Sequence, residues 1–185
     1  IRKNDNIFIV CTNFKSGNED VKVLLEHVAN GGTAFISSQY FWGDFADTLS
    51  LNTQDYFFNS NDFNIRKDTS YLTIANPYFD STRKFMFRRD NIHSYFDKFD
   101  TTRTTVVVKN EDHQPVTIRI AWGKGNLILN STPLAFSNIN MLAKENHHLV
   151  SGMLSYLPSS GNIYRTEYYH LGRMEASTPL RFILT

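Results

Sequence analysis

The sequence predicts an α/β domain in which a parallel sheet carries an added antiparallel β-meander. An apolar run, an amphipathic helix and a second apolar run follow one another over residues 7–38, which is the length of a strand–helix–strand unit. Residues 104–132 consist of alternating segments broken by short turns, as in antiparallel strands. The 185 residues are 41% hydrophobic and 14% aromatic, which is enough for one domain with a sizeable core.

The first half of the predicted sheet comes from the strand–helix–strand unit. Residues 7–12, IFIVCT, form a continuous apolar run that is typical of a strand buried on both faces. Asn18 or Ser16 can cap the helix that follows, and the two glycines at 31–32 end it. Residues 33–37, TAFIS, are a second buried strand. The apolar stripe of the helix consists of Val21, Leu24, Leu25 and Val28.

The middle of the chain is less regular. Residues 41–51 indicate a short helix, and residues 71–77 a strand that ends at a proline. Residues 85–100 are rich in aromatic side chains and predict irregular structure. We therefore expect a single domain over residues 1–185, with an irregular, aromatic-rich insertion over residues 40–100.

The last third predicts the meander, a second helix and a final strand. Strands are expected over 104–110, 116–122 and 126–132, with a glycine turn, GKG, between the last two. Residues 162–171 indicate a last strand. The second amphipathic helix is outlined by Leu142, Leu149, Val150, Met153, Leu154 and Leu157, with Pro158 just past its end.

Charge and cysteine content exclude several functions. Nineteen basic and eighteen acidic residues leave a net charge of +1, so we expect no nucleic-acid partner. The single cysteine, Cys11, excludes an internal disulfide framework and a cysteine-built zinc site. The six histidines show no metal-binding spacing, so we expect neither a metal nor a cofactor. No apolar run reaches about 18 residues, and the abrupt ends of the chain suggest a fragment of something longer.

Two serines stand at the end of the second predicted strand, where an α/β protein can present a nucleophile. A nucleophile elbow needs the pattern G-x-S-x-G, whereas Ser37 and Ser38 are followed by Gln39 and Tyr40. We therefore interpret the serines as hydrogen-bonding or ligand-contacting residues. Asp44 follows the same strand end and can face the ligand-binding edge of the sheet, although a solvated helix face is the simpler interpretation.

The polar residues at these predicted strand ends define a candidate ligand-binding crevice without a catalytic set. The candidate residues are Asn13, Ser37, Ser38, Gln39, Asp44, Ser131 and Thr132. The aromatic residues of 40–100, mixed with basic ones, can instead stack on single-stranded nucleic acid or on a small-molecule or glycan ligand, or they can pack against the sheet or a protein partner. We favour the packing or partner surface.

Two stretches resemble a known fold. DVKVLLEHVANGGTAFISSQYF, residues 20–41, resembles the helix, double-glycine turn and strand of the class I glutamine amidotransferase-like fold, in the branch with ThuA-like and gliding-motility-associated proteins. WGKGNLILN and the residues that follow it to 157 resemble the late segment of that branch. The overall arrangement of these motifs is most similar to an uncharacterised family of Bacteroidetes membrane proteins with a domain of unknown function, and the resemblance covers roughly the first fifth and the last two fifths of the chain.

The resemblance implies a flavodoxin-like, mostly parallel sheet with helices on both faces, placed between two transmembrane helices. It implies a bacterial protein anchored in the inner membrane, with this domain in the periplasm and a protein partner in a membrane-associated assembly. The catalytic cysteine of the amidotransferases would fall at about Ser37 or Ser38, and the residues directly after NLILN are Ser131, Thr132 and Pro133, with no histidine among them. We therefore expect a non-catalytic binding or scaffold domain with a degenerate crevice. The alternatives are a serine hydrolase that uses Ser38, and a carbohydrate-binding module that uses the aromatic segment.

Overall fold

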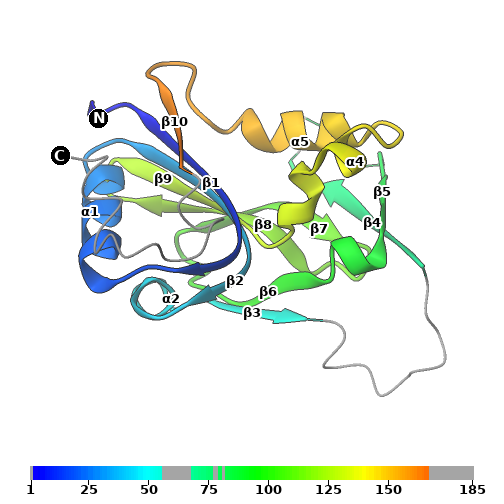
Figure 1. Cartoon of the computed structure of the whole chain (residues 1–185), viewed down its shortest axis with the longest axis horizontal. Helices are drawn as coiled ribbons and strands as arrows, with labels where there is room; N and C mark the ends of the chain where they lie inside the picture. Colours follow the sequence, from blue (N-terminus) through cyan, green and yellow to red (C-terminus); the bar gives the residue numbers. More distant parts are fainter. Residues whose placement is uncertain (1, 56–67, 77–78, 81, 167–185) are drawn as a thin grey trace.

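A twisted eight-stranded sheet forms the centre of the molecule (Figure 1). The computed structural model describes residues 2–55, 68–76, 79–80 and 82–166. The strand order is β10-β1-β2-β9-β8-β7-β4-β5, and β3 and β6 form a separate pair. The strands are β1 (Asn6–Lys15), β2 (Thr33–Trp42), β3 (Asn52–Asp55), β4 (Thr69–Ile74), β5 (Phe85–Arg88), β6 (Ser94–Lys98), β7 (Thr104–Asn110), β8 (Pro115–Trp122), β9 (Gly125–Asn130) and β10 (Ile163–Thr166).

Four α-helices stand out in the described residues, and only α1 is longer than nine residues. The helices are α1 (Asn18–Ala29), α2 (Asp44–Leu49), α4 (Asn138–Met141) and α5 (Asn146–Leu154), with 3₁₀ turns η1 (Arg89–Asn91) and η2 (Pro133–Phe136). The expected helices over 18–30 and 41–51 are confirmed as α1 and α2. The second amphipathic helix is confirmed as α5, which is shorter than the apolar stripe suggested. No helix in the described part of the chain is long and apolar enough to cross a bilayer.

The prediction of a mostly parallel, flavodoxin-like sheet is wrong. β10–β1, β1–β2 and β2–β9 are parallel, whereas β9–β8, β8–β7, β7–β4 and β4–β5 are antiparallel. A doubly wound sheet joins successive parallel strands through crossover helices. Within the described residues, α1 is the one helix that directly joins two neighbouring parallel strands, β1 and β2. The meander strands β7, β8 and β9 supply three of the eight strands of the sheet instead of forming an appendage to it.

The strand–helix–strand unit and the meander were both predicted correctly as local structures. β1 and β2 pair in parallel from Asn6 opposite Thr33 to Lys15 opposite Trp42. On its other side, β2 pairs with β9, which forms a hairpin with β8. Together these segments build the middle of the sheet, which fixes the strand ends that carry the candidate site.

The hairpin between β8 and β9 packs tightly on the end of α1. The backbone N–H of Lys124 donates to the carbonyl oxygen of Ala29 at 2.9 Å. A Cβ atom at Gly125 would lie 2.0 Å from the carbonyl oxygen of Gly32 and 2.3 Å from that of Val28. Only a residue without a side chain allows this approach, so the glycines of the GKG turn have a packing role as well as a turn role.

The segment expected to be irregular contains regular strands. Residues 85–100 include β5, which extends the main sheet beside β4, and β6, which pairs with β3. The prediction of irregular structure there is wrong because short aromatic strands show little periodicity. Residues 56–67 of the expected insertion lie outside the described residues. The last expected strand is present as β10, and its residues from 167 onward also lie outside them.

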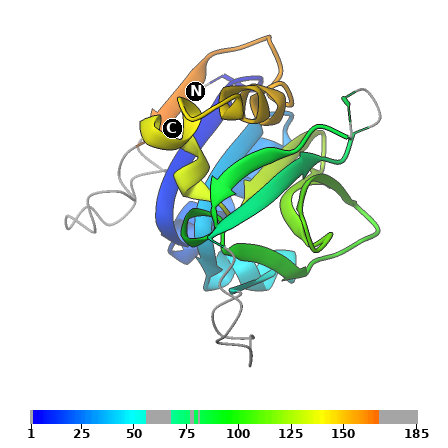
Figure 2. The same cartoon turned by 90° about the vertical axis from the view of Figure 1, so that its right-hand side faces the viewer.

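Two apolar layers cover the sheet. One contains the apolar faces of α1 and α2, with Leu24 and Phe45 fully buried against β1, β2 and β9. The other contains α5, with Leu149 and Met153 fully buried against β4, β7 and β9. Figure 2 shows β10, in orange, beside β1, in blue, and β10 is the edge strand of the sheet.

Candidate functional site

Two of the expected crevice residues, Ser37 and Thr132, belong to a buried polar cluster formed by residues of β2, β8 and β9. Ser37 was expected at the end of its strand, but it lies in the middle of β2, which continues to Trp42. The Ser37 hydroxyl donates to Oδ1 of Asn130 at 2.6 Å, and Nδ2 of Asn130 donates to Oγ1 of Thr117 at 2.8 Å. The backbone N–H of Thr132 donates to the same Asn130 oxygen at 2.9 Å. Each of these residues is at most 1% exposed. The cluster therefore satisfies polar groups inside the protein and ties three strands together.

Ser38 and Ser131 direct their hydroxyls to backbone carbonyls. Oγ of Ser38, which is fully buried, lies 2.8 Å from the carbonyl oxygen of Tyr40 and 3.2 Å from that of Thr12. Oγ of Ser131 donates to the carbonyl oxygen of Ser94 at 2.7 Å. These are side-chain hydrogen bonds to backbone carbonyls, and the bonds to Thr12 and Ser94 connect segments that are distant in sequence.

A closed ring of side-chain hydrogen bonds lies at the end of β2. The amide nitrogen of Gln39 is 3.0 Å from Nε2 of His93 and 3.1 Å from the hydroxyl of Tyr40, and donates to both. The Tyr40 hydroxyl and Nδ1 of His93 in turn donate to Oδ2 of Asp55, at 2.9 Å and 2.6 Å. This pattern assigns the proton of the His93 ring to Nδ1, because Nε2 accepts from the amide.

The ring is preorganised and only partly open to solvent. The side chain of Asp55 is 4% exposed and that of His93 is 14% exposed. An aspartate that accepts from Nδ1 of a histidine is the arrangement that orients a general base in many enzymes. In this ring the Gln39 amide already occupies Nε2, which is the nitrogen that such a base would use.

Burial changes the acidity of two side chains near this strand end. The pKa of Tyr40 is raised by burial first, and further by the hydrogen bond to Asp55 and the charge of that carboxylate. Burial also raises the pKa of the Cys11 thiol to about 11, and a hydrogen bond with Ser38 lowers it by a smaller amount. Both groups therefore stay protonated at neutral pH.

A strip formed by the side chains of Asn13, Tyr40 and Trp42 runs along the hydrogen-bonded ring. Asn13 is opposite Tyr40 in the β1–β2 register, and both alternate with the buried pair Phe14 and Phe41. Because neighbouring residues of a strand point to opposite faces, the Asn13 and Tyr40 side chains lie on the face away from that apolar pair. Trp42 is 50% exposed, and its ring centroid is 5.9 Å from that of Tyr40. Trp42 and Asn13 thus lie beside Tyr40, which is itself a member of the hydrogen-bonded ring.

Asp44 lies on a different surface, in an open groove of about 480 Å³ between α1 and α2. Its side chain is exposed, as is that of Asp47 on the same short helix. Lys22 and Trp122 line the groove as well. Asp44 is therefore placed among the solvated residues of a helix face, beside α1.

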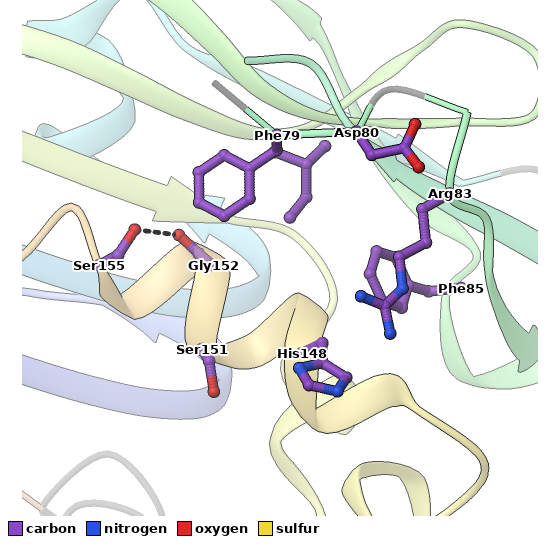
Figure 3. A pocket seen from close by; sticks show the side chains of 9 residues that line it. Phe79, Asp80, Arg83, Phe85, His148, Ser151, Gly152 and Ser155 are labelled. Atoms are coloured by element: carbon purple, nitrogen blue, oxygen red, sulfur yellow. Dashed lines mark hydrogen bonds between the residues drawn. The ribbon is translucent and has the colours of Figure 1, made fainter. Parts of the chain in front are cut away.

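A smaller cavity of about 270 Å³ lies between β4, β5 and α5 (Figure 3). Its lining residues are Ile74, Phe79, Asp80, Arg83, Phe85, His148, Ser151, Gly152 and Ser155. The Arg83 guanidinium lies 5.3 Å from the centre of the Phe85 ring and pairs with Glu145. None of these residues belongs to the expected crevice.

The structure thus brings Ser37 and Thr132 together through Asn130, and Gln39 into the hydrogen-bonded ring. It leaves Asn13 exposed at the border of the ring and Asp44 in the α1–α2 groove. Sequence reasoning missed Tyr40, Asp55, His93 and Asn130. Asp55 and His93 meet only because β3 pairs with β6, and no sequence signal in that segment indicated the pairing. Within the described residues, no group of three or more His, Cys, Asp or Glu side chains could hold a metal ion.

The structure is a mixed-sheet domain with a hydrogen-bonded ring of polar side chains near the end of β2. The sequence matches a family model, described as Domain of unknown function (DUF4350), over residues 2–154. The chain belongs to this family. No curated protein sequence matches it.

Solved structures share the fold at low sequence identity. The N-terminal domain of mmIFT52 is 11% identical with a TM-score of 0.55, and the alignment covers 85% of this chain and 78% of that one. The cytoplasmic protein STM3548 from Salmonella typhimurium is 12% identical with a TM-score of 0.53, over 83% and 71% of the two chains. The exo-β-1,4-mannosidase Op5Man5 from Opitutaceae bacterium strain TAV5 is 14% identical with a TM-score of 0.50, over 82% of this chain.

The glycosidases similar to this chain are much larger proteins. The chain spans 25% of the length of the mannosidase and 22% of a β-galactosidase from Bacillus circulans sp. alkalophilus. The likeness to the mannosidase shows a shared fold.

Proposed function

We propose that this protein is a non-catalytic binding domain whose ligand lies against Tyr40 and Trp42 at the end of β2. The observation that carries the proposal is the closed hydrogen-bonded ring of Gln39, Tyr40, Asp55 and His93. The ring fixes its side chains in one arrangement before a ligand arrives, which lowers the entropic cost of binding. Because Gln39 donates to Nε2 of His93, the ring favours recognition over proton transfer.

The placement of Ser38 supports a binding role over a serine hydrolase. Its hydroxyl is fully buried and hydrogen-bonds to backbone carbonyls, whereas a nucleophile must reach the substrate. A serine-reactive fluorophosphonate is expected to leave Ser38 unlabelled in the folded protein. Turnover of a small ester or amide that disappears in Ser38→Ala would contradict the non-catalytic proposal.

The chemistry of the strip favours a saccharide as the ligand. A sugar ring presents an apolar face that stacks on aromatic rings and hydroxyls that hydrogen-bond to amides and imidazoles. Trp42 and Tyr40 supply the rings, and Gln39 and Asn13 supply amides beside them. We therefore propose carbohydrate binding at the end of β2 and not across the whole aromatic segment.

Tryptophan fluorescence tests this proposal directly. The chain has two tryptophans, and Trp122→Phe keeps a ring beside Arg103 while leaving Trp42 as the single reporter. Mannobiose or cellobiose is expected to change the fluorescence of this variant in a saturable way. Gln39→Ala in the same background is expected to weaken the affinity roughly tenfold, the effect of one lost hydrogen bond with a partner left unpaired.

A control variant tests whether the loss of any exposed aromatic side chain changes the saccharide affinity. Tyr164→Ala removes an aromatic ring that is 38% exposed on β10, and saccharide affinity is expected to stay unchanged. Fluorescence that no saccharide alters, in a variant that melts as cooperatively as the parent, would remove the saccharide assignment.

The cellular setting is also proposed, on the strength of the family resemblance. We place the domain in a bacterial protein anchored in the inner membrane, facing the periplasm, with a protein partner in the same assembly. Fractionation of cells expressing the full-length protein, with protease added to spheroplasts, tests this setting. Recovery in the cytosolic fraction would overturn it.

A further inference from the structure

The cavity between β4, β5 and α5 has an apolar floor. Ile74 and Phe85 are 3% and 4% exposed, and Phe79 packs on the same apolar layer. The backbone of α5 closes one wall at Gly152, where a Cβ atom would lie 2.6 Å from Cδ1 of Ile74. A compact apolar group placed on this floor would be removed from water on several sides.

Basic groups stand at the opening of the cavity. Arg83 lies over the Phe85 ring, and in the view of Figure 3 its guanidinium extends toward the imidazole of His148. Asp80 also lines the cavity, but its Oδ1 accepts hydrogen bonds from the backbone N–H and the hydroxyl of Thr82. In the same view Asp80 lies at the end of the cavity away from His148.

A carboxylate already occupies this basic opening. Oε2 of Glu145 accepts from Nη2 of Arg83 at 2.5 Å, and its side chain remains 69% exposed. The hydrogen bond from Arg83 and the charge of that guanidinium lower the pKa of Glu145, and the charges of His148 and His147 add to this effect. Surface ion pairs of this kind stabilise a protein weakly. A second carboxylate can therefore displace Glu145 if it brings additional binding energy.

We propose that this cavity binds a small monocarboxylic acid through Arg83, with a single ring or branched chain of the acid on the apolar floor. The carboxylate replaces that of Glu145 on the guanidinium, and the apolar group supplies the binding energy that Glu145 lacks. A cavity of about 270 Å³ is at the small end of ligand pockets, which limits the ligand to one such group. This site is independent of the proposed function at the end of β2.

Calorimetric titration with 3-phenylpropanoate, and with its neutral amide 3-phenylpropanamide, tests the site in the whole chain. The acid is expected to bind and the amide to bind at least tenfold more weakly, because only the acid forms a charge-assisted pair. Glu145→Gln removes the internal competitor, so the acid is expected to bind roughly two- to fivefold more tightly. Arg83→Gln is expected to weaken binding of the acid roughly tenfold or more.

Lys84→Gln provides the matched control, because it removes a neighbouring positive charge that does not line the cavity. Binding of the acid to this variant is expected to equal that of the parent. The proposal is overturned if acid and amide bind equally, if Arg83→Gln binds the acid as the parent does, or if the acid does not bind to Glu145→Gln at millimolar concentration. Melting curves of each variant confirm that the fold is retained.

Discussion

Cys11 is the single cysteine of the chain, and its thiol lies in the apolar layer of α1. Burial raises the pKa of this thiol to about 11, so the reactive thiolate is scarce at ordinary pH. At pH 8 the thiolate fraction is about one in a thousand, since each pKa unit is a factor of ten. We expect iodoacetamide to leave native Cys11 unmodified at pH 8 and to label it once denaturant exposes it. Mass spectrometry before and after unfolding checks this, and labelling of the native protein at the rate of a free thiol would contradict it.

The polar residues of the candidate site could be predicted only in part. Gln39 follows a strand that the sequence indicates clearly, so its place at the sheet edge was foreseeable. Its partner His93 is 54 residues away and reaches Gln39 through the pairing of β6 with β3. Ser37 and Thr132 were expected to face a ligand, whereas the side chain of Asn130 binds both inside the core. A polar residue at a strand end looks the same in sequence whether water or another side chain satisfies it.

The contact between α1 and the β8–β9 hairpin explains why a glycine is needed at position 125. An alanine there would place its Cβ 2.0 Å and 2.3 Å from two backbone carbonyl oxygens, far inside van der Waals contact, and backbone cannot move aside as a side chain can. We expect Gly125→Ala to lower the free energy of unfolding by about 3 kcal/mol, at the upper end of the cost of overpacking. Urea unfolding followed by circular dichroism measures this.

Gly17→Ser is the matched control at the level of the elements. Gly17 precedes α1 with an extended backbone, and nothing lies within 4 Å of a Cβ atom there. Serine caps helices slightly better than glycine, so we expect a change within about 0.5 kcal/mol, in the stabilising direction. Equal losses in the two variants would show that the contact at Gly125 has no special role.

Helices and strands could be predicted where their hydrophobic period continued over many residues. The stripe over α1 and the alternation over β7, β8 and β9 span enough residues to distinguish helix from strand. β3 and β5 have only four residues each, and their aromatic or polar composition carries no clear period. A strand has the same side-chain period whether its neighbour runs parallel or antiparallel to it. The predicted proportion of parallel to antiparallel pairs was therefore wrong.

Across the whole molecule, the order of the sheet depends on contacts between distant parts of the chain. The backbone N–H of Asn6 donates to the carbonyl oxygen of Asn162 at 2.7 Å. The Asp5 carboxylate accepts from the N–H of Asn162 at 2.9 Å, across 157 positions of sequence. These bonds place β10 outside β1 and bring the late chain back to the first strand. Nothing in the local pattern of residues 163–166 identifies this neighbour.

The parallel pairing of β1 and β10 determines how the domain responds to mechanical tension along its chain. Asn6 is paired with Ile163 and Ile9 with Thr166, so a force applied before Asn6 and after Thr166 pulls the two strands lengthwise in opposite directions. All the hydrogen bonds between the strands then carry the load together. Handles beside Thr69 and Arg88, which face each other at one end of the antiparallel β4–β5 pair, would instead open that pair one bond at a time.

Force spectroscopy with these two attachments should give a clearly higher rupture force for the β1–β10 geometry. Equal forces would show that another part of the sheet yields first. A domain held at both ends inside a larger assembly would thus resist stretching, because the force would act along the paired strands β1 and β10.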